Sequence, residues 1–172
     1  MIIFKMIISI AIIGICTYIG ILKAIRLKDR EYILREMVTF LELVKNEMNY
    51  MLTLLPNAYE VSRQKLNTKL KYAIGQIVVD MLDSNDSNYI NASIVKNISS
   101  IEGLTEYDKN VIISSLKNMG RSDIEGQMNI IDNSINILNN QINEAKDFKL
   151  KNSKLYKTIG AISGTMIVVL FV

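Results

Sequence analysis

Two uncharged, apolar stretches stand near the ends of the 172-residue chain, at residues 6–22 and 158–172. As a helix, the first would be about 25 Å long, close to the ~30 Å hydrocarbon core of a bilayer, and we expect it to span a membrane. The second would reach only about 22 Å, so we expect a membrane helix and leave open whether it crosses completely. Its Gly160 and Gly164 form a small-xxx-small pair that permits close packing against another helix.

Each stretch has an alternative interpretation. The first resembles a signal peptide, but no small-x-small cleavage site follows it and it is long for that role. A lipoprotein signal would use Cys16, and the preceding Ile15 is too large for the usual pattern. The second stretch has the alternative of a last helix buried in the soluble domain. We favour an uncleaved anchor and a second membrane helix packed on it.

Basic residues flank both stretches on the sides that face the middle of the chain. Lys23, Arg26, Lys28 and Arg30 follow the first, and lysines at positions 149, 151, 154 and 157 precede the second. Because Lys and Arg are enriched in cytoplasmic flanks, both flanks are predicted to be cytoplasmic. The chain then divides into an N-terminal membrane helix at residues 1–24, a cytoplasmic domain at 25–157 and a C-terminal membrane helix at 158–172.

The middle of the chain carries two stripes of apolar residues spaced three and four apart, which is the period of one helix face. Pro56 predicts where the first helix, of about 25 residues, ends or turns. Ser122 and Glu125 have the spacing of a capping box that would start the second helix, and Gly120 suits a turn before it. The second helix is able to continue through the lysines into the C-terminal stretch. The first stripe contains Leu34, Met37, Leu41, Val44, Met48, Met51 and Leu55, and the second contains Ile124, Met128, Ile131, Ile135, Leu138, Ile142 and Ala145.

Shorter helices are predicted between the two stripes. They cover residues 58–66, 69–82 and 89–99, with a polar loop at 83–88. Thr105 and Asp108 indicate the cap of a further helix that runs to Asn118. We therefore predict an all-α fold, a compact helical bundle between two membrane helices. A coiled coil through the two stripes is the alternative, and the short, punctuated middle favours the bundle.

The composition restricts the chemistry that is available. The chain has no histidine and one cysteine, which excludes histidine-based catalytic sets and an intramolecular disulfide, and removes the commonest metal ligand. Its net charge of +3 is too small to argue for nucleic acid binding. Residues 120–127, GRSDIEGQ, have the wrong glycine spacing for a phosphate loop and lack its lysine. We predict no catalytic residue, cofactor, metal or small-molecule substrate, structural roles for Glu47 and Asp123, and a buried, hydrogen-bonded Tyr50.

Three segments resemble the stage III sporulation protein AB family. Residues 47–58, EMNYMLTLLPNA, resemble its E-I-x-Y-x-x-T-P-L-x-x-A, and residues 119–127, MGRSDIEGQ, resemble its L-G-x-x-D-x-x-x-Q. Residues 156–164, YKTIGAISG, look like its closing K-x-Y-x-x-L-G-x-x-x-G pattern. The length and apolar ends match too, so the resemblance covers nearly the whole chain. The chain departs from the family pattern at one position. Leu54 stands where the family's T-P-L has its proline, and this chain has a proline two residues later, at Pro56.

The resemblance implies a function that composition and periodicity do not show. Members of this family act in endospore-forming bacteria as a subunit of the channel complex between mother cell and forespore. Their soluble domain is similar to the cytoplasmic domains of the type II secretion platform protein (the F component). The implied location is the cell membrane, on the mother-cell side of the outer forespore membrane, with the helical domain in the cytoplasm. The implied partners are the secretion-type ATPase of the complex (stage III sporulation protein AA), other membrane subunits and the lipid bilayer.

The resemblance also selects candidate residues. For each of them we favour a structural role over direct contact with the ATPase. Two other functions remain open at this point: a platform subunit of a non-sporulation secretion or pilus system, and a simple membrane-tethered scaffold. An enzyme with an acid pair in the bundle is a further, less favoured reading. The candidates are Glu47, Tyr50, Pro56, Gly120, Asp123 and Gln127.

Overall fold

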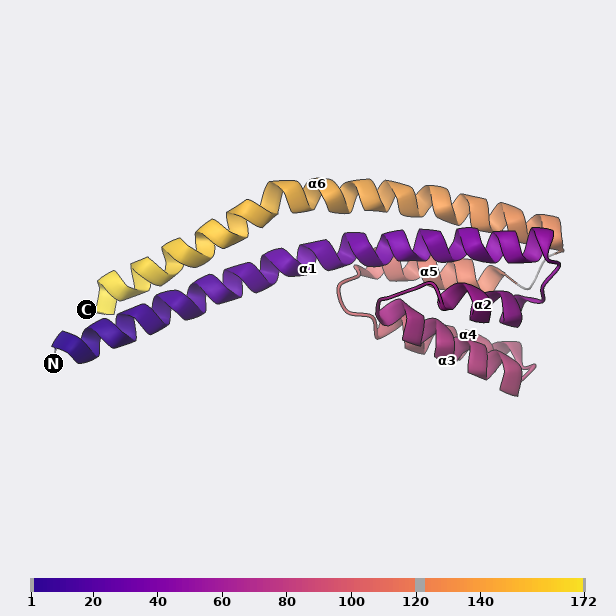
Figure 1. Cartoon of the computed structure of the whole chain (residues 1–172), viewed down its shortest axis with the longest axis horizontal. Helices are drawn as coiled ribbons and strands as arrows, with labels where there is room; N and C mark the ends of the chain where they lie inside the picture. Colours follow the sequence, from indigo (N-terminus) through magenta and orange to yellow (C-terminus); the bar gives the residue numbers. More distant parts are fainter. Residues whose placement is uncertain (1, 120–122, 172) are drawn as a thin grey trace. The chain divides into compact units, whose positions relative to one another are not determined.

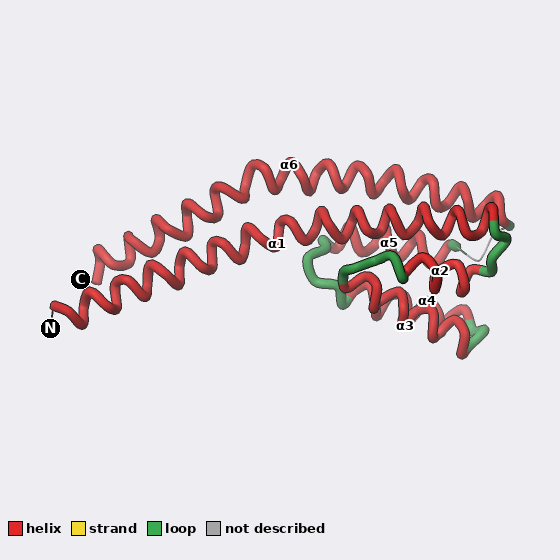
Figure 2. Tube along the Cα trace, viewed as in Figure 1, coloured by secondary structure: helices red, strands yellow, loops and turns green. Residues whose placement is uncertain are grey.

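All the regular secondary structure in the described part of the chain is α-helix. The computed structural model describes residues 2–119 and 123–171, and no strand occurs within these ranges. Figures 1 and 2 show two long helices, one at each end of the chain, and four short ones between them. This confirms the predicted all-α class. The helices are α1 (Ile2–Tyr50), α2 (Leu55–Arg63), α3 (Lys69–Asp83), α4 (Ser87–Ser99), α5 (Glu106–Asn118) and α6 (Ile124–Phe171).

The residues divide into two compact units. Unit 1 consists of residues 1–29 and 144–172, and unit 2 consists of residues 30–143. Both long helices contribute to both units, since α1 and α6 each continue past a unit boundary. The second apolar stripe and the C-terminal stretch therefore belong to one helix, as the sequence suggested. Across the described part of the chain, no helix combines the length and the apolar character needed to cross a membrane.

Unit 1 is a pair of helices in close contact. In Figure 1 the first part of α1 and the last part of α6 lie side by side. The helices approach closely at Gly164, where a Cβ atom would come within 2.9 Å of the Ile13 Cα and 3.2 Å of the Cys16 Cβ. Any larger residue would push the helices apart, so the packing requires glycine at this position.

The core of unit 2 forms on the first apolar stripe. Leu34, Met37, Leu41 and Val44 are completely buried on α1. Next to them, Phe40 packs edge-on against Tyr59 of α2, with ring centroids 5.1 Å apart. The Tyr59 hydroxyl donates to the Met119 sulfur at 3.7 Å, and burial raises the pKa of this hydroxyl well above its usual value. α1 thus supplies the central element on which α2 and its neighbours pack.

The predicted end of the first long helix was wrong. α1 ends at Tyr50, before Pro56, so Met51 and Leu55 leave the stripe: Met51 is exposed in the following loop and Leu55 begins α2. The prediction rested on periodicity alone. Met51, three residues after Met48, fits the apolar pattern whether or not the backbone at that point is helical. The chain turns instead at Leu52, whose φ of 51° is left-handed and closes the helix.

The short helices follow the predicted order and are capped locally. α3 and α4 pack on each other, as do α2 with α3 and α4 with α5. Thr68 and Asp86 accept hydrogen bonds from amides in the first turns of α3 and α4. The capping box predicted for Thr105 and Asp108 is present at the start of α5. α2 begins at Leu55, three residues before the predicted start at residue 58, because its first turn accommodates Pro56.

α6 covers unit 2 with part of the second stripe. Ile131, Leu138 and Ile142 are buried, whereas Ile124 at the start of the helix is exposed. Lys45 of α1 pairs with Asp132 on α6 at 2.5 and 2.7 Å. The buried stripe and this ion pair hold α6 against α1 within unit 2.

Candidate functional site

The turn between α1 and α2 is built around Glu47. Its carbonyl oxygen accepts hydrogen bonds from the amides of Met51 and Thr53, both at 3.2 Å. Its carboxylate accepts a longer bond of 3.4 Å from the Thr53 hydroxyl. Leu52, between them, takes the left-handed conformation. Glu47 therefore shapes this turn with its backbone and its side chain.

Leu54 and Pro56 carry the chain from this turn into α2. Pro56 lies in the first helical turn, where its missing N–H is not needed for a helical hydrogen bond. Leu54, just before the helix, has φ −63° and ψ 147°. These are angles that proline adopts. The backbone therefore suits a proline at either position, which explains how the departure from the family pattern at Leu54 leaves the turn intact.

The start of α6 is capped by Asp123. Its Oδ1 accepts a hydrogen bond from the amide of Gly126 at 2.9 Å, and its carbonyl accepts one from the amide of Gln127 at 2.9 Å. The cap was expected one residue earlier, at Ser122, which lies outside the described residues, as does Gly120. Asp123 takes the capping position because its carboxylate reaches the third amide of the helix while it lies directly before Ile124.

These two segments, about 70 residues apart in the sequence, meet at one end of unit 2. They line a pocket of about 370 Å³, to which Pro56 and Gln127 both contribute. The residues that carry the resemblance in two separate segments are thus brought to one place. The pocket is lined by Met48, Leu52, Thr53, Leu54, Leu55, Pro56, Ile124 and Gln127.

Five exposed apolar side chains lie in the two segments that form this pocket, and three of them, Leu52, Leu54 and Ile124, also line it. We call the five the apolar tip, and they are Tyr50, Met51, Leu52, Leu54 and Ile124. Leu52 and Leu54 lie two residues apart, and the side chain of each is 75% exposed, which is a large fraction for leucine. Acidic residues flank the tip along the chain, with Glu47 before it and Glu125 directly after Ile124. Such a surface is suited to binding another apolar surface and offers no group for covalent chemistry.

The prediction of a buried Tyr50 was wrong. Its side chain is 76% exposed, because α1 ends at this residue and none of the described helices covers it. Sequence reasoning also missed Leu52, Leu54 and Ile124 as surface residues. The only signal was the apolar run before Pro56, which does not keep the helical period.

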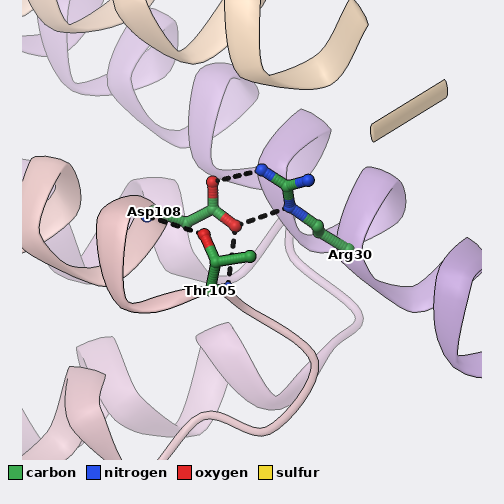
Figure 3. A network of polar contacts seen from close by, with 3 residues as sticks. All are labelled: Arg30, Thr105 and Asp108. Atoms are coloured by element: carbon green, nitrogen blue, oxygen red, sulfur yellow. Dashed lines mark hydrogen bonds and ion pairs between the residues drawn. The ribbon is translucent and has the colours of Figure 1, made fainter. Parts of the chain in front are cut away.

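Unit 2 also contains a buried ion pair that joins α1 to α5 (Figure 3). Arg30 donates through Nε and Nη2 to the two carboxylate oxygens of Asp108, at 2.7 and 2.9 Å. The Asp108 side chain is fully buried and that of Arg30 is 14% exposed. Thr105 completes the arrangement, since its amide donates to Asp108 Oδ2 at 2.9 Å and its hydroxyl accepts from the Asp108 amide at 3.2 Å.

The ionisation of Asp108 follows from these contacts. Burial alone would raise the pKa of this carboxyl, but the hydrogen bonds from Arg30 and Thr105 outweigh it and hold the pKa below its usual value. The carboxylate is thus charged and fully engaged. Such a group fixes the position of two helices and is not poised to abstract a proton.

A second buried carboxylate, Glu36 on α1, holds the start of α3. It accepts hydrogen bonds from the amides of Asn67 and Thr68, at 2.8 and 3.0 Å, and from the Thr68 hydroxyl. Thr68 in turn caps α3 through Leu70. Like Asp108, this acid links α1 to a short helix. Within the described residues, no three His, Cys, Asp or Glu side chains lie together as a metal ion would require.

The profile of stage III sporulation protein AB matches residues 5–172. The chain belongs to the stage III sporulation protein AB family. The match covers the turn at Glu47, the start of α6 and the contact at Gly164, so every feature described above lies inside the family's region.

The family assignment confirms the resemblance inferred from the three sequence segments. No curated protein and no solved structure matches this member of the stage III sporulation protein AB family. The similarity to the type II secretion platform protein therefore stays a prediction.

Proposed function

We propose that this chain is a non-enzymatic, membrane-anchored subunit of the sporulation complex that connects mother cell and forespore. In this proposal it couples the cytoplasmic, secretion-type ATPase of the complex (stage III sporulation protein AA) to the other membrane subunits. Family membership supports the role in stage III of sporulation. The observation that carries the coupling role is the apolar tip, an unusually exposed leucine-rich surface built by the family's own sequence segments.

The membrane part of the proposal rests on the sequence of the two apolar stretches. Residues 6–22 and 158–172 carry no charge. The structure does not describe the side chains of several residues in these stretches. The close contact at Gly164 supports a paired arrangement, since small residues allow helices to approach in lipid, where burial of apolar surface gives no driving force. Large apolar side chains such as Ile15, Ile162 and Val169 point outward from the pair, as lipid contact would require.

The basic flanks give the orientation of the proposed subunit. By the positive-inside tendency they support a cytoplasmic location for residues 25–157. The mother-cell side of the outer forespore membrane, where the ATPase is expected, is the location that the family resemblance implies. In this arrangement α1 and α6 are each continuous from the proposed membrane stretch to the helical domain. A force that the ATPase applies to unit 2 would therefore be transmitted toward the membrane along helices whose backbone hydrogen bonds are uninterrupted.

The apolar tip is the surface that we propose for the ATPase. Exposing leucine and tyrosine side chains to water is unfavourable by about 25 cal/mol per Å² of apolar area, so their clustering is best explained by a partner that covers them. The acidic residues on either side favour a partner whose apolar contact residues are accompanied by Lys or Arg. Glu47, Pro56, Asp123 and Gln127 then act by shaping the tip, and Tyr50 contacts the partner directly.

Binding of the purified ATPase to the full-length chain in detergent micelles tests this surface. Leu54→Ser should weaken binding by about tenfold or more, as expected for an exposed side chain at the centre of an interface. Leu82→Ser is a matched control, because Leu82 on α3 is also exposed, at 65%, and lies in the same unit. Equal binding by Leu54→Ser, Leu82→Ser and the unchanged protein would show that the ATPase docks elsewhere.

A deletion in the source bacterium tests the sporulation role. We expect normal division and engulfment, followed by a failing forespore reporter and few heat-resistant spores. Introducing the gene for the Leu82→Ser variant into the deletion strain should restore heat-resistant spores, whereas the gene for the Leu54→Ser variant should not. Normal spores in the deletion strain would instead favour a subunit of another secretion or pilus system.

A further inference from the structure

The charge of the chain is divided unequally between the two units. Unit 1 contains nine Lys or Arg and three Asp or Glu residues, a net charge of +6. Unit 2 contains eleven basic and fourteen acidic residues, a net charge of −3. The small net charge of the whole chain thus conceals a strongly basic helix pair.

Most of the positive charge of unit 1 lies on two short stretches, one on each helix. Among the described side chains of unit 1, the exposed lysines are Lys23 and Lys28 on α1 and Lys146, Lys151 and Lys154 on α6. We call these five residues the basic collar. Exposed apolar side chains, including Ile25 and Leu155, lie among them. The collar therefore presents ammonium groups and apolar surface together.

The collar lies at a definite distance along the helices from the close contact at Gly164. Lys154 is ten residues before Gly164, and Lys23 and Lys28 are seven and twelve residues after Cys16. At 1.5 Å per residue these intervals correspond to about 10–18 Å along the helices. Half of a bilayer's hydrocarbon core is about 15 Å thick. If the Gly164 contact lies near the centre of the membrane, Lys23, Lys28 and Lys154 reach the level of the phosphate groups. Lys146, eighteen residues before Gly164, lies about 27 Å from the contact and so on the aqueous side of the phosphates.

From this arrangement we propose that the basic collar binds the phosphates of acidic phospholipids and selects them over zwitterionic ones. A lysine is a compact charge on a flexible apolar stem, so it can place its stem against lipid chains and its ammonium against phosphate. A zwitterionic headgroup carries its own cation beside the phosphate and gains little from lysine, whereas an acidic headgroup has none. The inference rests on the proposed membrane anchoring and adds the kind of lipid that surrounds the anchor.

Native mass spectrometry of the full-length chain tests the selection directly. The protein in neutral detergent is mixed with equal amounts of phosphatidylglycerol and phosphatidylcholine, and the ratio of the two lipids retained is measured. The unchanged protein should retain mainly phosphatidylglycerol. Removing two collar charges with Lys151→Gln and Lys154→Gln should lower the ratio at least fivefold, since each lysine near an anionic surface contributes about a fivefold preference.

A matched variant separates the collar from the total charge. Lys65→Gln with Lys96→Gln removes the same charge from exposed lysines of unit 2 and should leave the lipid ratio unchanged. Equal retention of both lipids by the unchanged protein, or an equal loss in both double variants, would overturn the proposal.

Insertion is measured separately, by flotation of the full-length chain with phosphatidylcholine vesicles after alkaline extraction. We expect the protein and both double variants to float, because the apolar stretches are unchanged. A protein that fails to float but still retains phosphatidylglycerol would contradict the membrane anchoring and leave the collar as a binding site. A protein that floats without lipid preference would contradict the collar alone.

Discussion

Replacing Asp108 by asparagine should be one of the most damaging single-atom changes in unit 2. The asparagine side chain keeps the size of aspartate and can still accept a hydrogen bond from the Thr105 amide. It loses the negative charge that pairs with Arg30. Hydrogen bonds between charged groups contribute about 1.5–3 kcal/mol each, and breaking a buried pair costs about 3–5 kcal/mol. We therefore expect Asp108→Asn to lower the free energy of unfolding by about 2–3 kcal/mol, and Asp108→Ala by about 3–5 kcal/mol. Thr105→Ala, which removes only a cap, should cost about 1 kcal/mol.

The assay is urea unfolding of the full-length chain in a mild detergent, followed by circular dichroism. The matched control is Asp132→Asn. Its partner Lys45 lies closer, at 2.5 and 2.7 Å, but the two side chains are 34% and 50% exposed. Exposed pairs contribute at most about 1 kcal/mol, so Asp132→Asn should have a small effect. A loss at Asp132 equal to that at Asp108 would refute the reasoning that burial, and not distance, decides the contribution.

The same pair predicts a pH dependence. The pKa of Asp108 is lower in the folded chain than in the unfolded chain, where it is about 3.9. The stabilisation by the carboxylate is therefore complete well above pH 4 and is lost as the pH falls from about 4 through the folded pKa. The difference in unfolding free energy between the unchanged protein and Asp108→Asn should shrink over this range. A difference that stays constant down to about pH 2 would contradict the assigned ionisation.

Three further predictions concern single positions. Glu36→Ala leaves the amides at the start of α3 without their acceptor and should lower the unfolding free energy by about 2 kcal/mol, measured by the same urea titration. Leu52→Gly should leave stability unchanged or raise it by up to about 1 kcal/mol, because glycine accepts the left-handed φ without strain, whereas a large loss would show that Leu52 packs in the fold. Gly164→Cys should form a disulfide with Cys16 on mild oxidation. Its Cβ would start 3.2 Å from the Cys16 Cβ, and the small separation of the helices that relieves the 2.9 Å contact with Ile13 brings the two Cβ atoms into the usual range of about 3.5–4.5 Å. Mass spectrometry of thiol labelling detects it, and Val169→Cys, at a position 82% exposed, should keep two free thiols.

Local sequence determined the helices and most of their boundaries. A helix depends on hydrogen bonds between residues four apart and on side chains three or four apart, so its pattern is complete within a short window. This is why the capping box at Thr105 and Asp108 and the buried stripe from Leu34 to Val44 were predicted correctly. The family was also accessible from the sequence, since three short segments kept their order and spacing.

Tertiary structure alone decided which distant residues meet. Arg30 and Asp108 are 78 residues apart, and their pairing depends on how α5 packs on α1, which no short window contains. The end of α1 at Tyr50 depends on the turn at Leu52, and this turn exposes a tyrosine that the pattern placed in the core. The pocket that joins Pro56 to Gln127 has the same origin. Periodicity specifies which face of a helix is apolar, but only packing determines what covers that face and where it is left uncovered.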